Sequence, residues 1–396
     1  MTKLLLPVVT FSLLFAVSCG NNGARELVRR DVNGSASQIK TLIALTAESD
    51  SLPRTVKNGS IKMIDAYDWT SGFYPGTLWK LYDLTGDSLF LNRAITATAK
   101  LYPVKDYRST HDLGFMIFCS YGEQYAALHD TLSVRVIDDA AESLYSRYAP
   151  AIGLIRSWDF GEWNYPVIID NMMNLEMLFW ASRNTGDDKY RDAAIRHADR
   201  TMENHFRPDG SSFHVVSYRN DGTVESQGTF QGYSDSSSWA RGQAWGLYGY
   251  TMCYRYTKLD RYLSQARRIA DYIISHTDNI DDAVPYWDYD APNIPDAPRD
   301  ASAAAVTSSA LFELGTVTGD KKYLQFAERL LRSLSSDKYM ASGGDNGGFI
   351  LKHCVGHLPA DSEVDVPLNY ADYYYLEAVQ RYAEMNKITP RKLYNK

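Results

Sequence analysis

Two aspartates, Asp112 and Asp170, form a pair that could do acid–base chemistry. Each directly precedes an apolar segment, in His111-Asp112-Leu-Gly-Phe-Met and Ile169-Asp170-Asn-Met-Met-Asn. A protonated carboxyl group beside an ionised one is the minimum for acid–base cleavage of a glycosidic bond. Aspartate is also a good helix N-cap, so the spacing alone leaves a purely structural role open for both residues.

Asp170 stands in aromatic surroundings, with Trp158, Trp163 and Trp180 close to it in the sequence. Burying an unpaired carboxylate is costly, so a chain tolerates it mainly where a function is gained. A helix N-terminus favours the anion, and an acid at this place would need burial and a nearby negative charge to keep its proton.

Arg241 lies in a polar and aromatic stretch, Thr229-Phe-Gln-Gly-Tyr-Ser-Asp-Ser-Ser-Ser-Trp-Ala-Arg-Gly-Gln-Ala-Trp245. Residues four apart share a helix face, so Arg241 could hold a substrate carboxylate while Trp245 stacks on a sugar ring. The alternative is a structural ion pair with Asp235 or Asp300. His214 could donate to a substrate hydroxyl, although a lone histidine in a hairpin is more often structural.

Helical hairpins must position these residues, because the chain repeats a turn between apolar segments. Glycine suits the end of one helix and aspartate the start of the next. The repeats are Thr85-Gly-Asp87, Thr185-Gly-Asp187, Thr257-Lys-Leu-Asp260 and Thr318-Gly-Asp320. Self-similarity at this spacing is typical of stacked helix pairs.

Six polar signatures each lead into a helix that is apolar on most faces, as a helix buried on all sides must be. They begin at Asp68, His111, Ile169, Ser238, Arg299 and Val366. Amphipathic segments such as 188–205 and 261–276 alternate with them, and 36–47 would pair with the last inner helix. The pattern predicts an all-α fold, a single (α/α)6 barrel, with short β-hairpins at the mouth at 212–218 and 347–351. It gathers Trp69, Asp112, Asp170, Arg241 and Asp300 at one end.

Composition narrows the classes of function. The net charge is −7 with both signs dispersed, which argues against a nucleic-acid partner. The cysteines and histidines are scattered and form no metal-ligand spacing, so neither a metal nor another cofactor is expected. The 29 tyrosines and 8 tryptophans would suit stacking on sugars, or simply a large helical core.

The N-terminus is typical of an exported bacterial lipoprotein. Residues 1–18 carry Lys3, an apolar run and a small residue before Cys19, so we expect a signal peptide with Cys19 as the lipidated first residue. Residues 19–33 are interpreted as a lipidated tether and 34–396 as the catalytic domain. The expected location is periplasmic or outer-membrane anchored, with the lipid as the only membrane contact. The oligomeric state stays open.

Several motifs resemble those of the unsaturated glucuronyl hydrolases of glycoside hydrolase family 88, in order along nearly the whole mature chain. They are Asp68-Trp-Thr-Ser-Gly-Phe-Tyr-Pro-Gly, His111-Asp-Leu-Gly-Phe-Met, Ile169-Asp-Asn-Met-Met-Asn-Leu, Gln231-Gly-Tyr-Ser-Asp, Trp239-Ala-Arg-Gly-Gln-Ala-Trp245, Pro285-Tyr-Trp-Asp-Tyr-Asp-Ala-Pro292, Arg299-Asp-Ala-Ser-Ala-Ala and Tyr370-Ala-Asp-Tyr-Tyr-Tyr-Leu-Glu-Ala378.

The resemblance implies the same barrel and the release of a 4,5-unsaturated uronic acid from the non-reducing end of lyase-generated oligosaccharides, such as glycosaminoglycan disaccharides. It implies that Asp170 is the general acid/base and Asp112 the second essential carboxylate. Substrate contacts are implied for Trp69, His214, Gly228, Thr229, Gln231, Arg241 and Trp245. The family often has histidine where this chain has Phe230, so that histidine's role is absent or replaced.

Two other functions remain open at this point. An unsaturated rhamnogalacturonyl hydrolase uses similar chemistry on the same toroid, and a non-catalytic glycan-binding surface lipoprotein would also be helical and aromatic-rich. Lys352, His353 and His357 precede the last inner helix and could meet a sulfate on the adjacent sugar, or form a solvated loop.

Overall fold

The computed structural model describes residues 12–395, with side chains from residue 22 onward. Most of the predicted signal peptide and the side chain of Cys19 therefore lie outside the described residues. Within the described part, no helix combines the length and the apolar character needed to cross a membrane.

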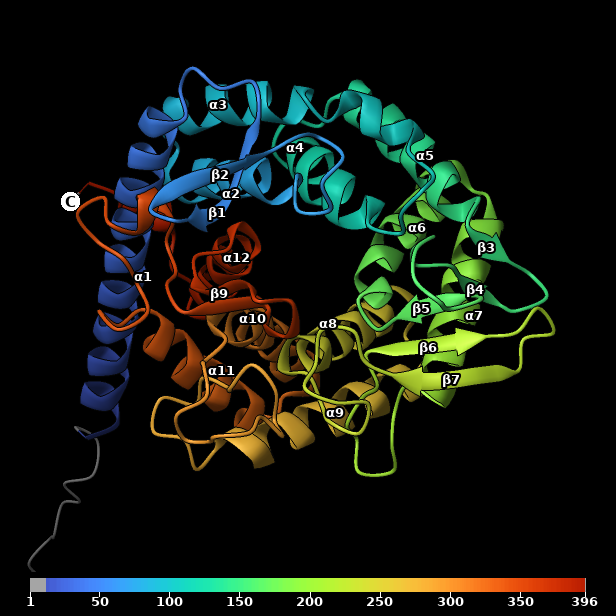
Figure 1. Ribbon diagram of the computed structural model, residues 1–396. Coiled ribbons are helices and arrows are strands. Elements are labelled where there is room, and N and C mark those ends of the chain that lie inside the picture. Colours follow the sequence, from blue (N-terminus) through green and yellow to red (C-terminus); the bar gives the residue numbers. More distant parts are fainter. Residues whose placement is uncertain (1–11, 396) are drawn as a thin grey trace, which may run out of the picture.

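Two concentric rings of helices form the barrel (Figure 1). The inner ring of the described chain consists of α2 (Phe73–Thr85), the π-helix η2 (Gly114–Gly122) continued by α4 (Glu123–Leu128), α6 (Asn171–Thr185), α8 (Ala240–Thr257), α10 (Ala301–Thr318) and α12 (Asn369–Met385). The outer ring consists of α1 (Ser12–Leu45), α3 (Ser88–Ala99), α5 (Thr131–Tyr145), α7 (Asp188–Asn204), α9 (Asp260–Thr277) and α11 (Lys321–Leu334). Each inner helix packs on the next, and α12 packs on α2, which closes the ring. The predicted (α/α)6 barrel is confirmed.

The repeated turn explains how the chain reverses between the rings. Gly86, Gly186 and Gly319 each end an inner helix in the left-handed conformation, with φ of 73°, 75° and 68°. This conformation is accessible to glycine without strain. The next aspartate then caps the outer helix: the side chains of Asp87, Asp187 and Asp320 each accept a backbone N–H two residues ahead. In the fourth copy Lys258 takes the left-handed position itself, with φ of 59°.

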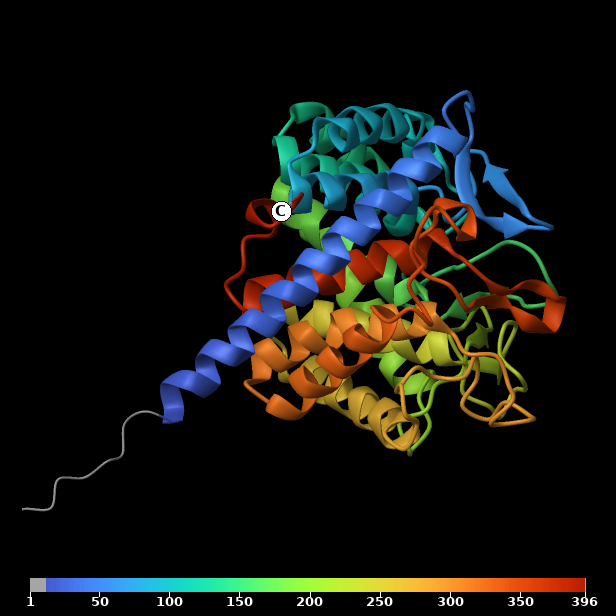
Figure 2. The same cartoon turned by 90° about the vertical axis from the view of Figure 1, so that its left-hand side faces the viewer.

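Short strands gather mainly at one end of the barrel (Figure 2). The hairpins pair β1 (Leu52–Lys57) with β2 (Ser60–Ile64), β3 (Tyr148–Ala149) with β4 (Leu154–Ile155), and β8 (Cys354–His357) with β9 (Ser362–Val366). A three-stranded sheet joins β5 (Pro166–Ile168), β6 (Val215–Tyr218) and β7 (Val224–Gly228). Single turns of 3-10 helix lie at η1 (Tyr102–Asp106), η3 (Asn346–Gly348), η4 (Leu358–Ala360) and η5 (Pro390–Lys392).

The strand prediction was right for one segment and wrong for the other. Residues 212–218 contain β6, but 347–351 do not form a hairpin. They begin in the turn η3 and make a single bridge between Met340 and Leu351. The backbone N–H groups of Ile350 and Leu351 are bound instead by the carboxylate of Asp372, on α12. A side chain brought in by the tertiary structure thus takes the place of a partner strand.

The prediction of a tether at 19–33 was also wrong. These residues are part of α1, and Ala24, Leu27, Val28 and Val32 are buried against the barrel. Asp31 is buried as well and accepts a hydrogen bond of 2.7 Å from Ser335 at the end of α11. The polar residues of this stretch misled the prediction, because only one face of α1 needs to be apolar.

Candidate active site

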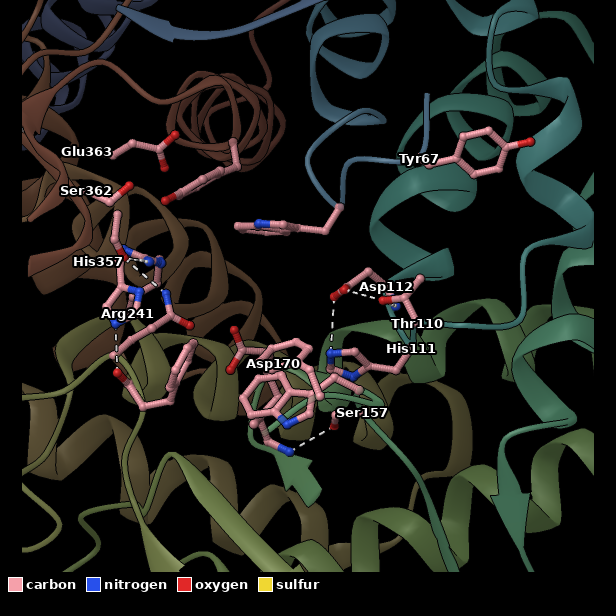
Figure 3. Close-up of a pocket in the computed structure, with 18 of the residues that line it drawn as sticks. Tyr67, Thr110, His111, Asp112, Ser157, Asp170, Arg241, His357, Ser362 and Glu363 are labelled. Atoms are coloured by element: carbon pink, nitrogen blue, oxygen red, sulfur yellow. Dashed lines mark hydrogen bonds and ion pairs between the residues drawn. The ribbon is translucent and has the colours of Figure 1, made fainter. Parts of the chain in front are cut away.

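A cavity of about 390 Å³ opens at the end of the barrel that carries the polar signatures (Figure 3). Its walls come from loops before the inner helices and from the hairpins β1–β2 and β8–β9. The lining includes Arg54, Tyr67, Trp69, Tyr107, Thr110, His111, Asp112, Trp158, Phe160, Asp170, Phe230, Gln231, Arg241, His357, Ser362, Glu363 and Tyr370. Segments from almost the whole sequence therefore meet in one place.

Asp112 and Asp170 both line this cavity, as predicted, and neither side chain acts as a helix cap. Asp170 precedes α6, but its carboxyl group makes no bond to the backbone of that helix. It is only 6 % exposed, and Oδ2 is buried without a hydrogen-bond partner. The sequence left open that both aspartates serve only as helix N-caps, and the structure does not show that role for either of them.

Asp112 is held by its two predecessors. Thr110 Oγ1 donates to Asp112 Oδ2 at 2.6 Å, and His111 Nε2 lies 3.2 Å from Oδ1. Burial raises the pKa of Asp112, an effect that His111 and Thr110 oppose and the negative charge of Asp170 reinforces. Burial lowers the pKa of His111, which keeps this ring neutral at pH 7. Asp112 is therefore the carboxyl group that holds a proton more readily than an exposed aspartate.

The helices that follow the two aspartates are joined through Asn174 on α6. Its Oδ1 accepts the backbone N–H of Phe115 at 3.0 Å, in the first turn of η2. The approach is close, because a Cβ added at Gly114 would lie 2.6 Å from the Cα of Asn174. A π-helix is a rare geometry that often accompanies functional sites. Here it lets the segment after Asp112 pack directly on the helix that follows Asp170.

Arg241 lines the cavity but is already paired. Its Nη1 lies 3.1 Å from Asp300 Oδ2 and also donates to the carbonyl of Val355, and Nη2 donates to the carbonyl of Gly356 at 2.6 Å. The guanidinium carbon lies 4.4 Å from the ring centre of Trp239 and 5.2 Å from that of Tyr370. The ion pair with Asp300, left open by the sequence, is present.

The predicted substrate contacts fall into two groups. Trp69 and Gln231 line the cavity; Gln231 Nε2 donates to the carbonyl of Gly356 at 3.1 Å. Trp245 does not line the cavity, because it is fully buried between Phe115 and Tyr374 at ring distances of 5.1 and 5.4 Å.

Gly228 and Thr229 also lie outside the lining and shape the loop that carries Gln231. The backbone N–H of Thr229 donates to Asp235 at 2.9 Å, and the same carboxylate would collide with a Cβ at Gly228. His214 is buried beside Asp170, with 3.5 Å between Nε2 and Oδ2.

The three basic residues proposed for sulfate separate in space. Lys352 Nζ donates to the carbonyl of Asp337 at 2.6 Å, and His353 pairs with Asp365 at 2.5 Å, so neither lines the cavity. His357 does line it. Its ring lies 4.8 Å from that of Phe230, and Nε2 is 2.8 Å from the Phe230 carbonyl oxygen. An imidazole thus stands beside the position where the family often has histidine.

The sequence did not reveal Arg54 as part of the site. Arg54, on β1, pairs with Asp68 at 2.7 Å and with Glu363 on β9 at 2.6 Å, and its guanidinium lies 5.7 Å from the ring of Trp69. Nothing near Arg54 in the sequence marks it, because Glu363 lies 309 residues away and meets it only when the ring closes.

No group of three or more histidine, cysteine or acidic residues in the described part of the chain is placed to hold a metal ion. Cys119, Cys253 and Cys354 are buried and free.

Comparisons with known proteins agree with the motifs. The family model of Glycosyl Hydrolase Family 88 matches residues 47–387. An unsaturated glucuronyl hydrolase of Formosa agariphila is 42% identical over 393 residues, which cover 96% of this chain and 98% of that relative.

Two solved structures extend this likeness to the fold. A crystal structure of an unsaturated glucuronyl hydrolase specific for heparin is 46% identical, covers 92% of this chain and 99% of that one, and has a TM-score of 0.89. A mutant unsaturated glucuronyl hydrolase of Streptococcus agalactiae, complexed with dGlcA-GalNAc6S, is 30% identical, covers 91% of each chain and has a TM-score of 0.76. These relatives do not favour the rhamnogalacturonyl or the non-catalytic alternative. The protein belongs to glycosyl hydrolase family 88, as its motifs predicted, and is a glycoside hydrolase.

Proposed function

We propose that the protein releases a 4,5-unsaturated uronic acid from the non-reducing end of lyase-generated oligosaccharides, with glycosaminoglycan disaccharides as substrates. The observation that carries the proposal is the meeting of Asp112 and Asp170 in one cavity lined by Trp69 and Arg241. Aromatic rings suit the C–H face of a sugar, and a guanidinium suits its carboxylate.

The reaction would start at the double bond rather than at the anomeric carbon. A protonated Asp170 donates its proton to C4, and positive charge develops at C5 and the ring oxygen. Asp170, now ionised, takes a proton from the water molecule that attacks C5. The resulting hemiketal opens by breaking the bond between C5 and the ring oxygen. C1 is then a hemiacetal, which releases the remaining saccharide as an alcohol.

Asp112 would support Asp170 electrostatically. Two carboxylates near one another disfavour simultaneous ionisation, which helps the pair to keep one proton. In the free site burial favours this proton on Asp112, so the proton has to move to Asp170 before C4 is protonated. Once positive charge develops in the transition state, the remaining negative charge of the pair stabilises it. This division of work fits the bonds of Asp112 to Thr110 and His111, which hold it in place.

Arg241 would attract the substrate carboxylate mainly through its charge. A bidentate grip through both terminal nitrogens would break its bonds to Asp300 and the carbonyls of Val355 and Gly356. Losing such buried charge-assisted bonds is expensive. We therefore expect Arg241 to remain on its protein partners while the uronic acid binds.

The test is the ultraviolet absorbance of the conjugated double bond, which hydration removes. Purified protein should abolish this absorbance in unsaturated disaccharides derived from heparin or chondroitin, and leave it in rhamnogalacturonan-derived substrates. Unchanged absorbance across the whole panel would contradict the proposed function. Loss of signal only with the pectin-derived substrates would favour the rhamnogalacturonyl alternative.

We also propose that the protein is exported and anchored by a lipid on Cys19, in the periplasm or on the outer membrane. The support is in the sequence: an apolar run after Lys3, followed by Val17-Ser18-Cys19-Gly20.

A further inference from the structure

We infer that His214 is a positioning residue for the proton donor: it binds Oδ2 of Asp170 and so leaves Oδ1 as the oxygen that carries the proton to the substrate. The inference rests on the proposed function, because it concerns the acid role of Asp170. It also differs from the role that the family resemblance implied for His214, which was a contact to the substrate.

The backbone brings the two residues together. Strands β5 and β6 pair in antiparallel register, with Ile168 opposite Val215. The pairing continues by one bond, since the N–H of Ile169 donates to the carbonyl of His214 at 3.0 Å. His214 directly precedes β6, and Asp170 follows β5 by two residues, so the paired strands place them side by side. The position of His214 therefore does not depend on a flexible loop.

Two backbone bonds determine the tautomer of His214. Its Nδ1 lies 3.1 Å from the backbone nitrogen of Phe230 and 3.1 Å from that of Gln231, and both N–H groups donate to it. A ring nitrogen that accepts hydrogen bonds carries no proton. The proton of the neutral ring is therefore on Nε2. A proton on Nδ1 would break both bonds.

Nε2 of His214 faces Oδ2 of Asp170 at 3.5 Å. Both atoms are buried, and neither has another hydrogen-bond partner. Leaving a buried donor and a buried acceptor unpaired is costly, and catalytic hydrogen bonds are often long before substrate binds and shorten in the complex. The pair is therefore arranged to close into an N–H···O bond.

This bond would distinguish the two oxygens of Asp170. An oxygen that accepts an N–H is the poorer place for the acidic proton, so the proton resides on Oδ1. Oδ2 is buried and Oδ1 is not among the buried unpaired atoms, so Oδ1 is the oxygen open to the cavity that Asp170 lines. The other charged or titratable groups that act on Asp170 are His111 and Asp112 before η2, Arg241 on α8, and His205 after α7.

Two substitutions separate the acceptor role of Nδ1 from the donor role of Nε2. In His214→Asn the side-chain oxygen can still accept the N–H groups of Phe230 and Gln231, but no donor reaches Asp170. In His214→Gln the longer side chain can place an amide N–H near the position of Nε2. The pair is compared with the wild type by the pH dependence of kcat and by KM on a disaccharide that the wild type cleaves.

Activity of a general acid falls as pH rises through its pKa, and an N–H donor to the carboxylate lowers that pKa. Removing the donor in His214→Asn should move the alkaline limb of kcat upward by about one pH unit and lower the plateau of kcat about tenfold, with KM nearly unchanged. His214→Gln should keep the limb close to that of the wild type.

An alkaline limb that does not move in His214→Asn would overturn the inference. A rise in KM in both variants with an unchanged limb would also overturn it and return His214 to the substrate. If His214→Asn does not fold, as judged by its circular dichroism, His214→Gln decides alone, because a shifted limb there contradicts the inference. Absence of wild-type turnover would instead be a failure of the proposed function.

Discussion

At the scale of single residues, Asp170 shows how a helix start can serve chemistry instead of stability. Its position before α6 is that of an N-cap, yet its carboxyl group makes no bond to the helix backbone. The neighbouring turns use Asp87, Asp187 and Asp320 as true caps. Burial alone does not explain the difference, because the buried Asp300 still caps α10 through the N–H of Ser302. What distinguishes Asp170 is that its carboxyl group faces the cavity and not the backbone of its helix.

Asp170→Asn should therefore lower kcat by about 10²- to 10⁴-fold, the range attributed to a general acid or base, because an amide cannot donate and recover the proton. The fold should remain, since the side chain holds no helix end. The matched control is Asp187→Asn, which removes a cap carboxylate on the outer ring. It should keep full activity and cost at most about 1 kcal/mol of stability. Activity in Asp170→Asn above a tenth of the wild type would assign the acid role to another residue.

Arg241 and Arg54 illustrate a second point at this scale. Both guanidinium groups line the cavity, and both are paired with carboxylates of the protein, Asp300 for one and Asp68 with Glu363 for the other. Such pairs fix the walls of the site before substrate arrives, which reduces the cost of ordering them on binding. These ion pairs also offset part of the positive charge that Arg241 and Arg54 present to the substrate.

At the scale of elements, α1 is the part of the fold that sequence reasoning misjudged. It is 34 residues long and lies along the barrel beside α2 and α12 (Figure 2). Among its described side chains Ala24 is already buried, well before residue 34, where the domain was expected to start. Residues 24–33 of this helix are thus structural and not a spacer.

Chains that begin at residue 22 and at residue 34 test this directly. The shorter chain loses the buried side chains of Leu27, Val28 and Val32 and the bond between Asp31 and Ser335. Each buried aliphatic side chain contributes about 1.5–3 kcal/mol. Thermal unfolding should therefore occur about 10 °C lower than in the longer chain, which itself should match a chain that begins at Cys19. Equal unfolding temperatures would restore the interpretation of 22–33 as a tether.

At the scale of the whole molecule, the ring brings distant segments to one mouth. The hairpin β8–β9 supplies carbonyls to Arg241 and a carboxylate to Arg54, although Gly356 lies 115 residues from Arg241 and Glu363 lies 309 residues from Arg54 in the sequence. The N-terminal end of α1 lies away from the end of the barrel where β1–β2 and β8–β9 gather (Figure 2). A lipid attached near the start of α1 would thus leave the cavity facing away from the membrane.

The anchor itself is tested by Cys19→Ser in a bacterial host fed with labelled palmitate. The wild type should carry the label and sediment with membranes, because acyl chains bind the bilayer with about 0.8 kcal/mol per buried CH₂ group. The variant should carry no label. Unlabelled wild-type protein in the soluble fraction would contradict the proposed anchoring, without bearing on the catalytic assignment.

The sequence by itself determined the class of fold and the family. The turns containing glycine and aspartate, and the alternation of apolar and amphipathic helices, are local signals, because capping and hydrophobic periodicity depend on neighbouring residues. The same signals placed Asp112 and Asp170 at inner-helix starts, and the structure puts both in the cavity. Trp69 and Gln231, for which the family motifs implied substrate contacts, also line the cavity.

Only the tertiary structure decided how the side chains are paired. Arg241 pairs with Asp300, and His214 lies against Asp170. Trp245 lies in the core and not in the cavity. Each of these outcomes depends on partners far away in the sequence. Buried polar groups must find such partners, and a ring of helices offers them only after it closes. The candidate acid–base residues could thus be predicted from the sequence, whereas the charged and hydrogen-bonding partners of these residues could not.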